Sequence, residues 1–271
     1  MEKQSFNLWE NTPGKCEEIP IITWYQPQNK ILDCAVVIFA GGAYGSRAEY
    51  EGKDYGEFLA QTGITAFVVD YRVSPHRFPL PLLDARRAVR YIRHNAEKFA
   101  IDKNKVYVMG SSAGGHLASL ISTYFEPIDF EGIDEIDNED FIPNGQILCY
   151  PVTTLCDYNI ASIGTGNNLI GDKYQPYNPE QYLSRKKLSA EYNVSEKTPK
   201  AFIWHTFADG GVDVRNSLLY ATALREYSVP VEMHLYPDGE HGIGLATKPT
   251  KEQMHAHQWT DALITWLKYI N

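Results

Sequence analysis

The sequence lacks a long hydrophobic run. Among its 271 residues, no stretch approaches the roughly 18 consecutive apolar residues that a membrane-spanning helix requires. The first residues, Met1-Glu-Lys-Gln-Ser-Phe6, have no apolar stretch behind a basic start, so no signal peptide is expected. We therefore expect a cytoplasmic protein with no membrane partner.

Positive charge is in short supply. The 25 Lys and Arg residues are outnumbered by 34 Asp and Glu residues, which gives a formal net charge of −9. An acidic chain repels the phosphate backbone of nucleic acids and the anionic surface of membranes. These partners are therefore not expected, and the partner that we expect is a small molecule.

Cysteine is scarce, and its spacing shows no metal-binding pattern. The four cysteines are Cys16, Cys34, Cys149 and Cys156, and no two of them form a CxxC pair. Cys34 and Cys149 lie in apolar runs and are predicted to be buried thiols. The sequence predicts neither a metal nor an organic cofactor.

What the sequence does contain is a series of short apolar runs that alternate with helical patterns. The runs whose length is typical of strands buried on both faces cover residues 31–40, 64–71, 146–151 and 201–206. Further strands are expected at 21–26, 106–109 and 231–236, and helices at 51–62, 82–99, from 113, at 214–227 and up to 270. This alternation predicts an α/β fold with a parallel sheet that helices cover on both faces.

Other stretches bear on the organisation of the chain. No internal repeat and no Gly- or Ser-rich linker is present, so residues 1–271 are expected to form a single α/β domain. Residues 1–20 are predicted to be irregular, and residues 152–198 are predicted to form a loop-rich excursion over the active-site edge. Residues 126–140 carry eight acidic side chains and no basic one, and are interpreted as a solvated connection. Their spacing is not that of an EF-hand loop.

One stretch combines a strand, a tight corner and a helix. In Lys105-Val-Tyr-Val-Met-Gly-Ser-Ser-Ala-Gly-Gly-His-Leu-Ala-Ser-Leu120, glycines stand two residues before and two residues after Ser112. This is the G-x-S-x-G spacing of a nucleophile elbow, in which strained backbone holds a serine hydroxyl above the sheet edge. Ser111 is the rival nucleophile, but it has no glycine two residues before or two residues after it. Ser112 is therefore the predicted nucleophile.

A serine hydroxyl needs a base, usually a histidine whose far nitrogen is held by a carboxylate. Two loops that follow predicted strands supply such residues, Asp209 and His241, in the chain order Ser, Asp, His. Asp213 is the competing acid, and Asp238 is assigned to a turn. Other histidines fit less well by position: His76, His94, His116, His234, His255 and His257.

The oxyanion that forms when a serine attacks a carbonyl needs fixed hydrogen-bond donors. The backbone N–H of Ala113, directly after the nucleophile, is one predicted donor. Gly42 and Ala43, in the glycine turn after the strand that ends at Ala40, are predicted to supply the others.

Several short segments together resemble a known family. Phe39-Ala-Gly-Gly-Ala-Tyr44, Asp70-Tyr-Arg-Val73, Gly110-Ser-Ser-Ala-Gly-Gly-His116, Trp204-His-Thr206 and Gly239-Glu-His-Gly242 are similar to the α/β-hydrolase carboxylesterases. The likeness is strongest to the bacterial acetylxylan-esterase-like, or sugar-ester hydrolase, group. It extends from about residue 31 to the last helix. The chain departs from the family pattern at Ala40, Ala43, Ala208 and Asp213.

The resemblance implies an α/β-hydrolase fold, with an eight-stranded and mostly parallel sheet, and hydrolysis through an acyl-enzyme. It implies a triad of Ser112, Asp209 and His241, with Gly42, Ala43 and Ala113 as the oxyanion donors.

The expected activity is that of a serine carboxylesterase on small esters, acetyl esters of sugars among them. One alternative is a serine peptidase of the prolyl-oligopeptidase type, but the chain has no room for a propeller domain and has Ala where those enzymes usually have Tyr after the serine. The other is a catalytically silent hydrolase fold that binds a ligand, although none of its triad residues is missing. No pattern bears on the oligomeric state.

Overall fold

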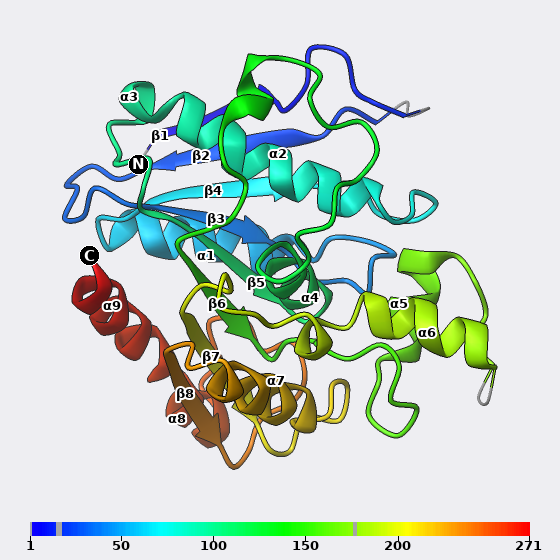
Figure 1. The fold of residues 1–271 in the computed structure, drawn as a ribbon. Coiled ribbons are helices and arrows are strands. Elements are labelled where there is room, and N and C mark those ends of the chain that lie inside the picture. Colours follow the sequence, from blue (N-terminus) through cyan, green and yellow to red (C-terminus); the bar gives the residue numbers. More distant parts are fainter. Residues whose placement is uncertain (1, 15–17, 176–177) are drawn as a thin grey trace.

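The computed structural model describes residues 2–14, 18–175 and 178–271. In this part of the chain eight strands form one sheet, in the order β1-β2-β4-β3-β5-β6-β7-β8 (Figure 1). The strands are β1 (Glu2–Asn7), β2 (Ile21–Gln26), β3 (Ala35–Phe39), β4 (Thr65–Asp70), β5 (Val106–Ser111), β6 (Gly145–Cys149), β7 (Ala201–Thr206) and β8 (Val231–Tyr236). Strands β3 to β8 are parallel, whereas β2 is antiparallel to both β1 and β4. The predicted mostly parallel, eight-stranded sheet is confirmed.

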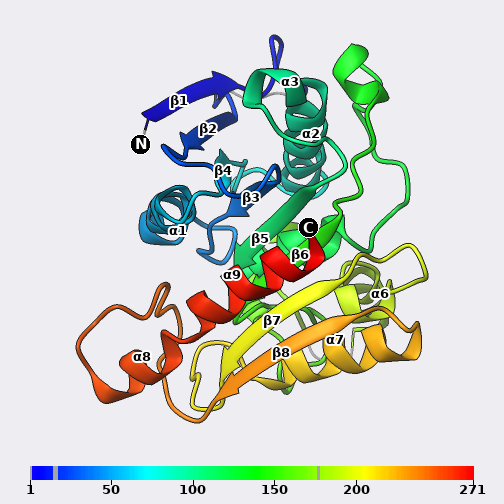
Figure 2. The same cartoon turned by 90° about the vertical axis from the view of Figure 1, so that its left-hand side faces the viewer.

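Helices cover the two faces of this sheet, as Figure 2 shows from the side. They are α1 (Glu49–Gln61), α2 (Leu80–His94), α3 (Ala96–Phe99), α4 (Ala113–Ile121), α5 (Ile163–Ile170), α6 (Pro179–Lys187), α7 (Arg215–Glu226), α8 (Lys251–Ala256) and α9 (Trp259–Ile270), with short 3₁₀ turns at Glu135–Asn138 and Ala190–Tyr192. Helices α1 and α9 pack on one face, and α2, α4 and α7 pack on the other.

Each face of the sheet has its own hydrophobic core. Along β3, Val36 and Ile38 point into the core with α1 and α9, and Val37 and Phe39 point into the core with α2, α4 and α7. All four side chains are fully buried. Because successive residues of a strand face opposite sides, a sheet covered on both faces requires continuous apolar runs. This explains why the runs were recognisable in the sequence.

Three expectations about secondary structure were wrong. Residues 2–7 form an edge strand rather than irregular chain, although their side chains are largely exposed and polar. The helix expected at 82–99 is divided at Asn95 into α2 and α3. The excursion at 152–198 contains two helices, α5 and α6, and is more regular than predicted. Strand β1 takes its conformation from pairing with β2, and the Asn95 side chain donates to the carbonyl of Tyr91 at 2.8 Å where α2 ends.

The acidic segment 126–140 is a largely exposed connection, as interpreted, but it also has a structural role that was not predicted. Arg86 and Arg87 on α2 are buried, and the segment 126–140 lies over them. Arg86 pairs with Glu131 at 3.0 Å, and Arg87 pairs with Asp134 at 2.6 Å. The acidic side chains therefore neutralise a row of arginines on the outer side of α2.

Cys34 and Cys149 are buried and free, as predicted, and Cys156 is also buried and free. Cys16 lies outside the described residues. Within the described ranges, no three His, Cys, Asp or Glu side chains are grouped so that they could hold a metal ion. Nor does that part of the chain contain a helix long and apolar enough to cross a membrane.

Candidate active site

Ser112 stands at the corner between β5 and α4. Its φ of 52° and ψ of −116° are strained for a residue with a side chain. The two flanking glycines are required by close backbone contacts: a Cβ at Gly110 would collide with the carbonyl of Gly114, and one at Gly114 with the carbonyl of Phe39. The sequence therefore allows β5 to turn directly into α4, with the serine at the turn.

His241 and Asp209 lie next to this corner, in loops that follow β8 and β7. His241 Nε2 is 2.9 Å from Ser112 Oγ, and His241 Nδ1 is 2.8 Å from Asp209 Oδ2. Gly211 makes room for the imidazole, because a Cβ at this position would lie 2.6 Å from His241 Cγ. The structure thus brings together the three residues that the sequence analysis selected from distant parts of the chain.

The environment of Asp209 determines which nitrogen of His241 carries a proton. Burial would raise the pKa of Asp209, but hydrogen bonds from His205, His241 and the Val212 N–H outweigh it, and the pKa lies well below its usual range. An ionised carboxylate only accepts hydrogen bonds, so His241 Nδ1 must be the donor. The lone pair of Nε2 therefore faces the hydroxyl of Ser112.

The alternatives to these residues lie in other environments. The hydroxyl of Ser111 is buried and donates to Tyr55 at 3.0 Å. The carboxylate of Asp213 pairs with Arg215 at 2.6 Å, and the Arg215 side chain is exposed whereas that of Asp213 is partly exposed. His116 is buried behind the corner, with Nε2 2.8 Å from the carbonyl of Leu188. None of these three side chains takes part in the contacts among Ser112, His241 and Asp209.

The loop after β3 carries Gly42 and Ala43, both of which line the cavity with Ser112. Gly42 has a φ of 131° and Ala43 a φ of 53°, so the loop is tightly wound. Ala43 keeps a left-handed conformation although it has a Cβ, and its carbonyl accepts a hydrogen bond from Asn168 Nδ2 on α5 at 2.8 Å. Among the described residues, the N–H groups of Gly42, Ala43 and Ala113 have no hydrogen-bond partner. They remain available to an oxyanion.

Glu51 on α1 is a buried acid that the sequence analysis did not identify. Its Oε2 accepts a hydrogen bond from the Gly41 N–H at 2.7 Å, and its Oε1 accepts one from the Tyr150 hydroxyl at 2.8 Å. The Tyr150 ring lies edge-on to the imidazole of His241, with centroids 5.3 Å apart. Burial raises the pKa of Glu51, and the hydrogen bonds and the charge of His241 only partly oppose this rise.

His205, inside β7, was missed as well. Its Nε2 is 3.0 Å from the carbonyl of Val212 and 3.3 Å from Asp209 Oδ2. Its Nδ1 is 2.8 Å from the hydroxyl of Ser217. Because a carbonyl only accepts, Nε2 carries the proton and also faces Asp209. A second imidazole therefore supports the carboxylate that holds His241.

The cavity in front of Ser112 has a volume of about 340 Å³. Besides the residues already described, Ser162 and Thr165 of the excursion line it. The volume lies at the small end of the range that ligand pockets occupy. The cavity therefore suits a small acyl group better than a long chain.

The parallel sheet, the strained serine between strand and helix, and the Ser–Asp–His order along the chain define an α/β-hydrolase. A family model described as BD-FAE matches residues 23–224. The chain belongs to this BD-FAE family of α/β-hydrolases.

Similar proteins include enzymes of xylan breakdown. The chain is 33% identical over 249 residues to endo-1,4-beta-xylanase B of Butyrivibrio fibrisolvens, a match that covers 89% of this chain and 38% of that protein. It is 31% identical over 220 residues to an acetylxylan esterase of Xylanibacter ruminicola, covering 79% of this chain and 42% of that protein. The chain thus spans about two fifths of the length of these curated relatives.

A solved structure covers the whole fold. The acetyl ester-xyloside bifunctional hydrolase from Caldicellulosiruptor lactoaceticus superposes with a TM-score of 0.83 at 36% identity, and the match covers 96% of both chains. The resemblance to acetylxylan-esterase-like α/β-hydrolases that the sequence indicated is confirmed by these relatives.

Proposed function

We propose that this protein is a serine carboxylic-ester hydrolase that removes small acyl groups, acetyl above all, from esters of sugars. The observation that carries the proposal is the contact of 2.9 Å between Ser112 Oγ and His241 Nε2, together with the contact of 2.8 Å between His241 Nδ1 and Asp209. Relatives named acetylxylan esterase and acetyl ester-xyloside hydrolase support the choice of substrate.

In the proposed reaction Ser112 Oγ attacks the ester carbonyl carbon while His241 Nε2 accepts the hydroxyl proton. The negative charge that forms on the carbonyl oxygen is stabilised by the N–H groups of Gly42, Ala43 and Ala113. The bond to the alcohol then breaks, and His241 returns the proton to the departing oxygen. Water attacks the acyl-serine by the same route and releases the acid. Asp209 keeps the imidazole in the required tautomer throughout.

The proposal is tested with p-nitrophenyl acetate and the variant Ser112→Ala. We expect kcat to fall by about 10³-fold or more, because the variant lacks the hydroxyl that His241 Nε2 contacts. Ser111→Ala is the matched control and should keep kcat within about threefold. Equal rates for the wild type and Ser112→Ala would contradict the proposal, and faster cleavage of prolyl amides than of the acetate would favour a peptidase.

Two further expectations belong to this proposal. Residues 1–271 act as a single α/β-hydrolase domain, in which the excursion 152–198 contributes to the substrate site. The enzyme works in the cytoplasm, without a metal or organic cofactor, on a small-molecule ester.

A further inference from the structure

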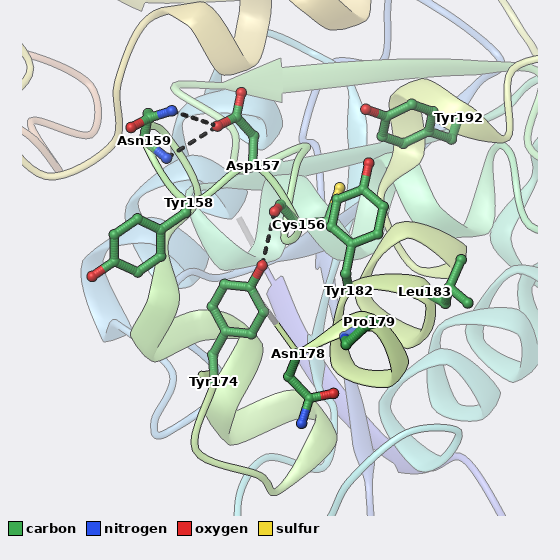
Figure 3. A pocket seen from close by; sticks show the side chains of 10 residues that line it. All are labelled: Cys156, Asp157, Tyr158, Asn159, Tyr174, Asn178, Pro179, Tyr182, Leu183 and Tyr192. Carbon is green, nitrogen blue, oxygen red and sulfur yellow. Dashed lines mark hydrogen bonds between the residues drawn. The ribbon is translucent and has the colours of Figure 1, made fainter. Parts of the chain in front are cut away.

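A second and larger pocket lies in the excursion itself (Figure 3). It has a volume of about 610 Å³, within the range of ligand-binding pockets. Four tyrosines, one carboxylate and two carboxamides give it its chemistry. We call it the tyrosine pocket, and these residues are Tyr158, Tyr174, Tyr182, Tyr192, Asp157, Asn159 and Asn178. Figure 3 shows Tyr158 and Tyr174 on one side of the pocket and Tyr182 and Tyr192 on the other.

The Tyr174 ring is held in place before any ligand arrives. Its hydroxyl donates to the carbonyl of Cys156 at 3.1 Å, and the guanidinium of Arg185 lies 4.3 Å from its centroid. The Arg185 side chain has no exposed surface and pairs with Asp172 at 2.6 Å. A ring with one face covered by a buried cation presents only its other face to a ligand. A fixed aromatic platform loses little conformational entropy on binding.

The other three rings are exposed, although folding usually buries much of an aromatic side chain. Tyr158 is 57%, Tyr182 39% and Tyr192 50% exposed. Single exposed aromatic residues are common, but several around one hollow mark a binding surface. Tyr158 also approaches Tyr174, with ring centroids 6.2 Å apart.

The polar groups of the pocket suit a neutral ligand that has hydroxyl groups. Asp157 Oδ1 accepts a hydrogen bond from the Asn159 N–H at 3.0 Å, and Oδ2 has no hydrogen-bond partner in the described part of the chain. Among the described residues that line the pocket, Asp157 alone is charged, so an anionic ligand is disfavoured. A pyranose ring has an apolar C–H face that stacks on tyrosine and hydroxyl groups at its edge that donate to a carboxylate.

The tyrosine pocket lies close to the cavity at Ser112. Asn159 lines the former and Ser162 lines the latter. Three residues of chain span at most about 11 Å, a distance that a short oligosaccharide covers. The chain between them is fixed, because Asn216 on α7 donates to the carbonyl of Ile160 at 3.1 Å.

We propose that the tyrosine pocket binds a pyranose ring of the glycan whose ester reaches Ser112. It would then select esters of oligosaccharides over simple esters. The inference rests on the proposed esterase activity, but sugar binding by the pocket can be measured without catalysis.

The kinetic test compares p-nitrophenyl acetate with acetylated xylotriose, using the double variant Tyr158→Ala/Tyr182→Ala. Both side chains are exposed, so their loss should not unfold the protein. We expect kcat/KM for acetylated xylotriose to fall by about tenfold or more, mainly through KM, and kcat/KM for the aryl acetate to stay within about twofold. Tyr227→Ala is the control, because Tyr227 is 49% exposed and follows the end of α7 that is remote from the active-site edge. Equal kcat/KM values for variant and wild type, or a parallel loss on both substrates, would overturn the inference.

The binding test mixes unesterified xylotriose or cellotriose with the Ser112→Ala protein. Saturation-transfer NMR detects the bound sugar. We expect at least one of the two sugars to bind, and the signal to be lost in the triple variant with Tyr158→Ala and Tyr182→Ala. If neither sugar binds, the tyrosine pocket is not a sugar site, whatever the esterase assay shows. If a sugar binds through these tyrosines but the wild type hydrolyses no ester, the proposed function fails and the sugar site stands.

Discussion

The carboxylate of Glu51, on helix α1, accepts a hydrogen bond from the backbone N–H of Gly41 at 2.7 Å. This bond attaches the start of the loop with Gly42 and Ala43 to α1. The other oxygen of Glu51 accepts from Tyr150, whose ring contacts His241. One buried acid therefore connects the loop of the proposed oxyanion donors to the proposed base. The negative charge of Glu51 also interacts with His241, and it would stabilise the imidazolium that forms there.

Glu51→Gln should lower activity and raise stability at the same time. A glutamine can keep the bond to Gly41 and donate to the oxygen of Tyr150, so the main loss is the charge that stabilises protonated His241. We expect kcat for p-nitrophenyl acetate to fall by about 10- to 100-fold, with KM within about threefold. The pKa of Glu51 is raised in the folded state, so its ionised form costs stability at neutral pH. The thermal midpoint at pH 7 should therefore rise in the variant. A fall in both kcat and the midpoint would indicate a merely structural role.

Asp209 and Asp213 form a matched pair for testing the assignment of the acid. Asp209→Asn removes the acceptor that fixes the Nδ1 proton of His241, so we expect kcat to fall by about 10³- to 10⁴-fold. Asp213→Asn breaks an exposed ion pair with Arg215 and should leave kcat within about twofold. Steady-state rates with an aryl acetate decide between them. A larger loss in Asp213→Asn than in Asp209→Asn would reverse the assignment.

The sheet and the serine corner could be predicted because their signals are local. Continuous apolar runs follow from burial on both faces, and the glycines around Ser112 follow from backbone contacts within the same corner. Edge strand β1 gave no such signal, because its side chains are exposed and its conformation comes from pairing with β2.

Other parts of the site depend on contacts between distant segments. Glu51 is 61 positions from Ser112 in the sequence, and only the packing of α1 against the glycine loop gives its carboxylate a role. His205 sits in an apolar strand four residues before Asp209, and that spacing at a strand end was a signal that could have been used. The burial of Arg86 and Arg87 by the acidic segment also required tertiary information.

The loop with Gly42 and Ala43 gives a pair of substitutions, one expected to lower activity and the other to raise stability. Gly42→Ala adds a Cβ that collides with the carbonyl of Ser46 at a φ of 131°, so the loop must move and take two proposed oxyanion donors with it. We expect kcat to fall by about 10²-fold or more. Ala43→Gly relieves a left-handed alanine with a φ of 53°, and should raise the free energy of unfolding by about 0.5–1 kcal/mol while kcat stays within about twofold.

Rates with p-nitrophenyl acetate and urea unfolding measure the two effects separately. If Gly42→Ala retains the activity of the wild type, the loop is not the source of the oxyanion donors.

His116 should make stability depend on pH in mildly acidic solution. Burial lowers the pKa of His116 from about 6.5 to about 4, so the folded protein holds it neutral. Its Nε2 faces the carbonyl of Leu188, which only accepts, so Nδ1 accepts from the hydroxyl of Tyr44, the residue after Ala43. As the pH falls from about 6.5 to about 4, the unfolded chain takes up a proton that the folded chain refuses. The contribution of neutral His116 to stability is therefore fully present above about pH 6.5 and is lost as the pH falls to about 4.

The loss attributable to this imidazole is at most about 3 kcal/mol across that window. Urea unfolding of the wild type and of His116→Gln, at intervals from pH 8 to pH 4, measures it. The variant is expected to be less stable at pH 8, because one of the two partners of the imidazole loses its hydrogen bond. Its stability should nevertheless fall less steeply than that of the wild type below pH 6.5, because an amide does not titrate. Two curves that stay parallel down to pH 4 would show that the proton is taken up elsewhere in the chain.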